Sequence, residues 1–144
     1  MNATLITSLL GLIGSLLLAA FTYWSTKRRE REAEWRKEKL TYYKAFVESL
    51  SGIVEGDDSP EGHKLCAKTT NNLLLFAPQF VIQALNEFRT EIAVSNPNRS
   101  RESHDKLLAT LLLAIRKDVG VQPADDQSSF KAILWTSGVG KNAA

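Results

Sequence analysis

The hydrophobic positions of this chain follow two different patterns, one before Lys27 and one after it. From Leu5 to Trp24 the sequence reads LITSLLGLIGSLLLAAFTYW, a run of twenty residues with no charged side chain. As a helix this run would be about 30 Å long, which matches the hydrocarbon thickness of a bilayer. Ten of its residues are Leu, Ile or Phe, and together they favour insertion by about 3 to 6 kcal/mol. The pattern predicts a transmembrane anchor within residues 1–26.

After the anchor, apolar positions recur at helical spacing. Residues 27–54 contain no Pro, and no Gly before Gly52, and they are rich in the strong helix formers Glu, Arg, Lys and Leu. We therefore expect the anchor helix to continue into a basic stalk over residues 27–54. The distal end of the stalk is expected to pack on the rest of the chain through a stripe of apolar residues that begins near Trp35: Tyr42, Tyr43, Phe46, Val47, Leu50, Ile53 and Val54.

Three further helices are predicted within residues 55–135. Ser59 can cap a helix that starts at Pro60, and Pro78 separates this helix from a second one. The loop at residues 95–98 precedes a third helix, which is capped by Ser100 or Ser103 and ends at Gly120. No segment alternates with the period of a strand, so the sequence predicts an all-α fold with a small helical bundle. The expected buried positions are Leu65, Thr69, Leu73 and Phe76, then Val81, Ile82, Leu85, Phe88 and Ile92, then Leu107, Leu108, Leu111, Leu112 and Ile115.

The segment after Val121 has a less regular pattern. Phe130, Ile133, Leu134 and Trp135 form an apolar motif that is either a short helix docked on the bundle or an exposed element that binds a partner. Docking is the favoured interpretation, because large apolar patches are usually covered. Residues 136–144 are expected to be disordered.

Charge fixes the expected orientation of the anchor. Tyr23 and Trp24 lie at its C-terminal end, where aromatic rings favour the membrane interface, and a cluster of cations follows: Lys27, Arg28, Arg29 and Arg31. The eight basic and four acidic residues of 27–44 give this region a net charge of +4. Cations on this flank predict a short N-terminus outside and a cytoplasmic C-terminal part, with anionic lipid head groups as partners of the stalk.

The sequence is less consistent with two other interpretations of the apolar run. A cleaved signal peptide carries its basic residues before the apolar stretch, and here they follow it. A buried core helix is the second alternative, but a charge-free run of this length is unusual in a small domain. The layout of anchor, basic stalk and helical domain recurs in small bacterial membrane proteins, which suggests a bacterial inner membrane by analogy.

One face of the predicted anchor consists of small residues. Thr7, Gly11, Ser15 and Ala19 recur at four-residue spacing, which lets two helix backbones approach closely in a membrane. Gly, Ser and Thr are also common in membrane helices that do not associate. The pattern therefore leaves self-association, or pairing with another membrane helix, as an open alternative to a simple tether.

Candidate chemistry changes this picture little. The two histidines, His63 and His104, have no metal-ligand spacing, and Gly138-Val139-Gly140-Lys141 lacks the first Gly and the final Ser or Thr of a phosphate loop. The single cysteine, Cys66, cannot form an intramolecular disulfide and reads as a small apolar helix residue. The sequence predicts no enzyme, no cofactor, no metal, no nucleic-acid partner and no small-molecule substrate.

These observations lead to two functional hypotheses. The first is an interaction or scaffold module, which holds a cytoplasmic protein partner at the membrane. The second is an oligomerising effector, which perturbs the bilayer when its cytoplasmic domain is triggered. The lone anchor and the apolar C-terminal motif favour the first, and the small-residue face of the anchor favours the second.

Overall fold

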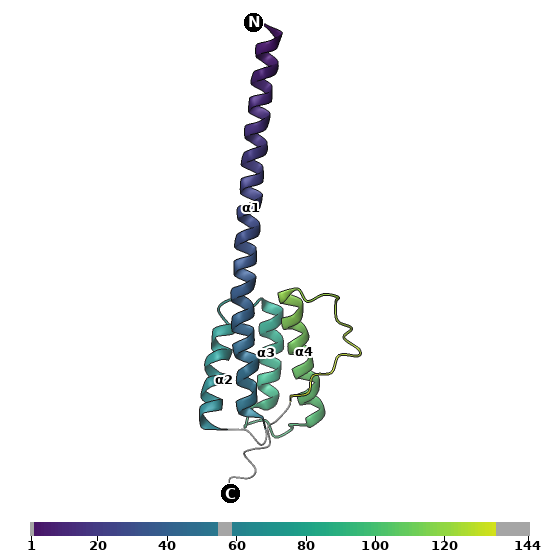
Figure 1. Ribbon diagram of the computed structural model, residues 1–144. Helices are drawn as coiled ribbons and strands as arrows, with labels where there is room; N and C mark the ends of the chain where they lie inside the picture. Colours follow the sequence, from purple (N-terminus) through teal and green to yellow (C-terminus); the bar gives the residue numbers. More distant parts are fainter. Residues whose placement is uncertain (1, 55–58, 135–144) are drawn as a thin grey trace. The chain divides into compact units, whose positions relative to one another are not determined.

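The computed structural model describes residues 2–54 and 59–134, and within these ranges it contains helices and no strand (Figure 1). This confirms the all-α prediction. The elements are α1 (Ala3–Leu50), the short 3-10 helix η1 (Ser51–Ile53), α2 (Pro60–Leu73), α3 (Gln79–Ile92) and α4 (Arg101–Val119). The chain divides into two compact units, residues 1–38 and 39–144, and each is described by itself below as the N-terminal unit and the C-terminal unit.

The N-terminal unit is helical and has no core of its own. None of its described side chains is buried, and Leu16, Leu17 and Leu18 are 61%, 67% and 70% exposed. α1 is the one helix of the described residues that is long and apolar enough to cross a membrane. Apolar side chains left in water cost about 25 cal/mol per Å², so this exposed surface is compatible with an apolar surrounding.

The C-terminal unit has a single hydrophobic core to which the last part of α1 and helices α2, α3 and α4 all contribute. The largest fully buried side chains are those of Tyr43, Phe46 and Leu50 from α1, Leu73 from α2, Val81, Leu85 and Phe88 from α3, and Leu108 and Leu111 from α4. All nine occupy positions that the apolar periodicity marked as buried. Residues 39–50 of α1 belong to this unit and contribute side chains to its core, whereas Trp35 and Tyr42 of the predicted stripe are 50% and 37% exposed.

Aromatic and hydroxyl contacts fix α1 against its neighbours. Phe76, in the connection between α2 and α3, lies 4.6 Å from Tyr42 and 6.0 Å from Tyr43 between ring centroids. Deeper in the core, the hydroxyls of Ser49 and Thr69 share a hydrogen bond of 2.7 Å. Whichever hydroxyl donates to the other, the second hydroxyl can donate to a backbone carbonyl of its own helix, that of Phe46 for Ser49 or that of Leu65 for Thr69. This polar pair is therefore satisfied in an apolar surrounding.

The helix ends follow the predicted capping signals. The Ser59 hydroxyl accepts a hydrogen bond of 3.0 Å from the Gly62 amide, and Pro60 is the first residue of α2. The Ser100 hydroxyl caps α4 in the same way through the Ser103 amide at 3.0 Å. Gly120 ends α4 with a φ of 74°, a left-handed conformation that glycine adopts without steric cost.

Three details differ from the sequence expectation. In α2 it is Cys66 that is buried, whereas Leu65 is 51% exposed, because the helix presents the face one residue further along to α1. α2 ends at Leu73 rather than near Phe76, since a tight turn precedes Ala77 and Pro78. Finally, the described part of the C-terminal segment, residues 121–134, contains turns but no helix, so the short docked helix is not formed there.

Candidate functional site

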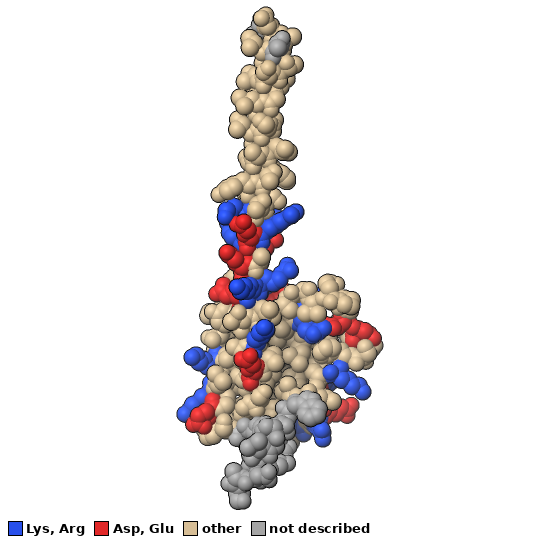
Figure 2. All heavy atoms as spheres, in the orientation of Figure 1, with Lys and Arg blue, Asp and Glu red and all other residues tan. Residues whose placement is uncertain are grey.

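The apolar part of α1 is the first functional feature, and its chemistry is uniform. Lys, Arg, Asp and Glu are absent from the sequence before Lys27, and Figure 2 shows the charged atoms gathering only beyond that stretch. Backbone amides and carbonyls are paired within the helix, which is the requirement for a segment in hydrocarbon. The hydroxyls of Thr7, Ser15 and Thr22 likewise donate to carbonyls of their own helix, at 3.2, 2.8 and 2.8 Å.

The small-residue face is open along α1. A methyl group added at Gly11 or at Gly14 would meet no atom within 4 Å. Thr7, Ser15 and Ala19, the other members of the predicted packing face, are exposed as well. The helix surface is therefore open at Gly11 and Gly14, and the pairing of this face with a second helix stays a prediction.

The predicted interface residues form a local network on α1. The Arg28 guanidinium lies 5.8 Å from the centre of the Trp24 ring and its Nε donates to Glu32 at 2.8 Å. Lys27 pairs with Glu30 at 2.8 Å. Because these pairs are exposed to solvent, they contribute little to stability. Tyr23, Arg29 and Arg31 are also exposed, so the whole predicted cluster is available to an interface.

A mostly buried polar cluster connects α1 to the end of α4 in the C-terminal unit. Lys39 Nζ donates to both carboxylate oxygens of Asp118 at 3.0 Å, and the Tyr43 hydroxyl donates to the same carboxylate at 2.7 Å. The Lys39 and Asp118 side chains are only 15% and 11% exposed. Burial, reinforced by the neighbouring carboxylate, raises the pKa of Tyr43 far above its ordinary value. Tyr43 is therefore a neutral donor at physiological pH.

The segment after α4 folds back onto that helix through a second polar pair. Arg116 binds Asp125 through two hydrogen bonds, both of 2.7 Å, and the bond to Arg116 lowers the pKa of the Asp125 carboxyl. The Arg116 guanidinium also lies 5.6 Å from the centre of the Phe130 ring. A bidentate guanidinium–carboxylate pair fixes orientation as well as distance. Arg116 thus holds residues 125–130 beside α4.

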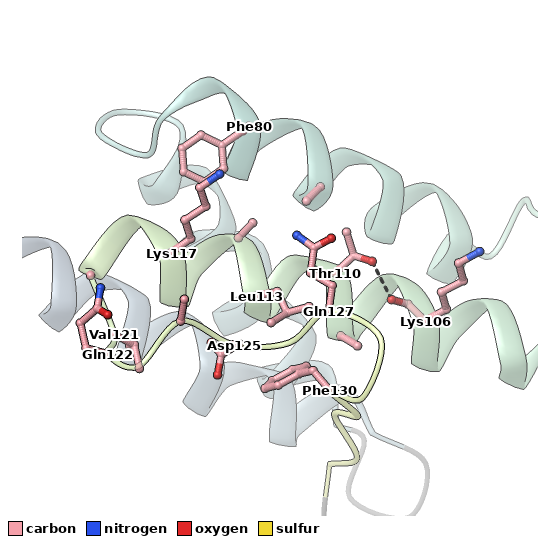
Figure 3. A pocket seen from close by; sticks show the side chains of 15 residues that line it. Phe80, Lys106, Thr110, Leu113, Lys117, Val121, Gln122, Asp125, Gln127 and Phe130 are labelled. Carbon is pink, nitrogen blue, oxygen red and sulfur yellow. Dashed lines mark hydrogen bonds between the residues drawn. The ribbon is translucent and has the colours of Figure 1, made fainter.

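This arrangement leaves a groove of about 660 Å³ between α3, α4 and the segment after Gly120 (Figure 3). Its apolar floor includes Ala84 of α3 and three residues of α4, Ala109, Leu113 and Ala114. Lys106 and Lys117 line it toward opposite ends of α4, and the Lys117 ammonium lies 5.6 Å from the centre of the Phe80 ring. The volume falls within the range of about 300 to 1,000 Å³ that is usual for ligand sites.

The structure separates the residues of the predicted partner motif. Phe130 lines the groove and, like Leu134, packs partly against the core. The intervening Ala132 is buried, whereas Ile133 is 72% exposed. Trp135 lies outside the described residues, as does the predicted disordered tail. The motif is therefore divided between contacts with the unit and an exposed side chain, and its role toward a partner stays a prediction.

Sequence reasoning missed the Lys39–Asp118–Tyr43 cluster and the groove. A signal for the first was present: Asp118 lies in the last turn of a helix, where the helix dipole disfavours an anion, so a cationic partner was to be expected. Which cation pairs with Asp118 depends on a contact between two residues that lie 79 positions apart in the sequence. The groove depends on how residues 121–130 return along α4, which no periodic pattern encodes.

In comparisons with protein-family models, curated proteins and solved structures, nothing matches this chain.

Proposed function

We propose that this protein is a single-pass membrane tether whose C-terminal helical unit, a small bundle, binds a protein partner and holds it at the membrane. The observation that carries the proposal is the contrast between the two units. The first exposes its apolar side chains along a helix that can cross a bilayer, whereas the second buries its own in a core and presents a groove. Tethering raises the effective concentration of a partner at the surface without any new contact.

Orientation follows from charge. The cluster of Lys27, Arg28, Arg29 and Arg31 flanks the C-terminal end of the apolar stretch, and cations on this side are retained in the cytoplasm. In this proposal the N-terminus is outside and the C-terminal unit is cytoplasmic. Tyr23 and Trp24 lie at the interface, and the basic flank contacts anionic lipids.

A comparison of two tagged chains tests the proposal. The full-length protein and a version truncated after Glu38 are expressed in the native cells, cross-linked, and isolated from membranes with mild detergent. We expect at least one cytoplasmic protein to be enriched with the full-length chain and not with the truncated one. Identical protein sets from both chains, or recovery of the full-length chain only from the soluble fraction, would contradict the proposal.

A second function, an oligomerising effector that perturbs the bilayer, is favoured by one observation. Gly11 and Gly14 leave an open strip on the apolar stretch of α1, which is the geometry that lets membrane helices approach closely. In this alternative the C-terminal unit responds to a signal and α1 forms the assembly. Overexpression of the inserted protein would then change the membrane potential, and an unchanged potential would exclude it.

A further inference from the structure

The groove beside α4 has a charge pattern that restricts what can bind there. Its lining contains three charged side chains, Lys106, Lys117 and Asp125. Asp125 is already bound by Arg116 through two hydrogen bonds of 2.7 Å, so its charge is locally compensated. Lys106 and Lys117 are both exposed. The groove therefore presents two cations to a ligand and no uncompensated anion.

The two lysines are set apart by a defined length of helix. Eleven positions of α4 separate Lys106 from Lys117, which corresponds to about 16 Å along the helix axis. The lining that α4 contributes between them is mostly apolar and consists of Ala109, Thr110, Leu113 and Ala114. An extended peptide covers about 13 Å in four residues, and side chains four residues apart point to the same side of it, so the flexible lysine side chains need to cover only the remaining few Å. Two acidic side chains at that separation would each meet a lysine while the residues between them contact the floor.

The geometry points to an extended peptide segment, with two acidic side chains about four residues apart and small apolar residues between them, as the ligand of the groove. This inference rests on the proposed function and names the chemistry of the partner. Polar side chains line the rim at Thr110, Gln122 and Gln127, and they can bond the main chain of such a peptide. Residues 135–144 of the protein itself contain one lysine and no Asp or Glu, so charge disfavours its own C-terminal residues as the occupant.

Peptide binding to the full-length protein in nanodiscs of uncharged lipid tests this inference. The probe is a fluorescent peptide with the central sequence Glu-Ala-Val-Ala-Glu, and the comparison peptides carry Lys in place of both Glu, or both Glu side by side. Binding is measured by fluorescence anisotropy at about 0.15 M salt, where the Debye length of about 8 Å limits the effect of distant charges. We expect the first peptide to bind at least about tenfold more tightly than either comparison peptide, which corresponds to about 1.4 kcal/mol.

Charge-reversed variants locate the binding. The double variant Lys106→Glu, Lys117→Glu is expected to weaken binding of the acidic peptide at least about tenfold and to strengthen binding of the Lys-substituted peptide. The matched control is Lys64→Glu with Lys68→Glu, two exposed lysines of α2 that do not line the groove. It makes the same change in net charge and should alter binding by less than about twofold, since screening limits distant charges. Equal losses in the two variants would overturn the inference.

A steric variant gives an independent check. Ala109→Phe fills the floor without changing charge, and we expect it to reduce binding of the acidic peptide while thermal unfolding still shows a folded protein. Unchanged binding would overturn the inference. The proposed function is tested separately: if the Lys106→Glu, Lys117→Glu protein still recovers its cytoplasmic partner from membranes, the groove is not the docking site and the tether stands.

Discussion

Lys39 and Asp118, far apart in the sequence, form an ion pair in which both side chains are almost covered by the C-terminal unit. The pair joins the last part of α1 to the last turn of α4, and the Tyr43 hydroxyl bonds the same carboxylate. An anion at a helix C-terminus is unfavourable by itself, so Lys39 and Tyr43 offset both that cost and the cost of burial. The cluster connects the helix that carries the apolar stretch to the helix that forms the groove.

Loss of this carboxylate should destabilise the protein. We expect Asp118→Asn to reduce the free energy of unfolding by about 1.5 to 3 kcal/mol, because the hydrogen bonds that Lys39 and Tyr43 donate to a charged acceptor are lost or weakened away from water. Urea unfolding of the full-length protein in mild detergent, followed by circular dichroism, measures the change. The control is Asp105→Asn on the same helix, where the carboxylate is 47% exposed and the expected effect is below about 0.5 kcal/mol. Equal changes in the free energy of unfolding would show that the buried cluster stabilises the protein no more than an exposed carboxylate does.

The raised pKa of Tyr43 predicts a pH dependence. In the unfolded chain this phenol titrates near its ordinary value of 10.0, whereas in the folded protein it stays protonated well above that value. The unfolded state therefore binds fewer protons above pH 10, and stability is lost there with a slope of about 1.4 kcal/mol per pH unit from this group.

The variant Tyr43→Phe separates the contribution of Tyr43 to the pH dependence of the unfolding free energy from the contributions of the lysines and other tyrosines. The difference in unfolding free energy between the original protein and the variant should be constant below about pH 9 and should shrink as the pH rises past about 10. Measurements between pH 7 and pH 11 test this. A difference that does not change with pH would contradict the assignment of a raised pKa to Tyr43.

The close approach of Gly52 and Gly62 predicts that a Gly→Ala substitution in α2 lowers the stability of the protein, although such a substitution usually raises it. A methyl group at Gly52 would lie 2.7 Å from the Gly62 Cα, so the backbones of η1 and α2 touch there. Gly→Ala normally stabilises a helix by about 1 kcal/mol. We expect Gly62→Ala instead to destabilise by about 1 to 3 kcal/mol through overpacking. The adjacent, exposed His63→Ala is the control, with less than about 0.5 kcal/mol expected in urea unfolding.

In the proposed tether, membrane insertion depends on the apolar stretch of α1, and two charges there should abolish it. Arg at the centre of a membrane helix costs about 2.5 to 3.5 kcal/mol, so Leu10→Arg with Leu17→Arg cancels the gain of about 3 to 6 kcal/mol from the apolar residues. We expect the variant to leave the carbonate-resistant membrane fraction. The control, Leu10→Ile with Leu17→Ile, should remain in it. Retention of the Arg variant in membranes would mean that the apolar stretch is not what holds the protein there.

Oligomer formation distinguishes the two proposed functions. Gly11→Leu places a bulky side chain on the small-residue face, at a position with no neighbouring atom within 4 Å in the described structure. The tether proposal expects the same mass for the original protein and the variant in mild detergent. A defined oligomer that dissociates in the variant would make α1 an assembly interface and favour the membrane effector.

Local signals in the sequence accounted for most of the helices, because each depends on neighbouring residues. Ser59-Pro60 and Gly120 mark helix ends through caps and backbone conformation, and the structure has both. The burial of Cys66 in place of Leu65 was harder to predict from the sequence. Neighbouring residues of a helix lie about 100° apart, and the packing of α2 on α1 decides which of them is covered.

The candidate site was predicted less well, since it depends on contacts between distant residues. Nothing near Lys39 indicates that its partner is Asp118. Residues 121–130 reach α4 through Arg116 and Asp125 rather than through a periodic apolar face, and Pro123 interrupts any helical pattern there. The groove exists only because this irregular segment returns beside α4, so its position follows from tertiary structure alone.

The most direct test of the tether is the location of the protein that the cross-linking experiment identifies. Its membrane-bound fraction is measured by fractionation in cells that contain either the original protein or the Leu10→Arg, Leu17→Arg variant at equal levels. The account predicts that the partner is enriched in membranes with the original protein and moves to the soluble fraction, still bound to the C-terminal unit, with the variant. A partner that stays in membranes with the variant would contradict the claim that this protein holds it there.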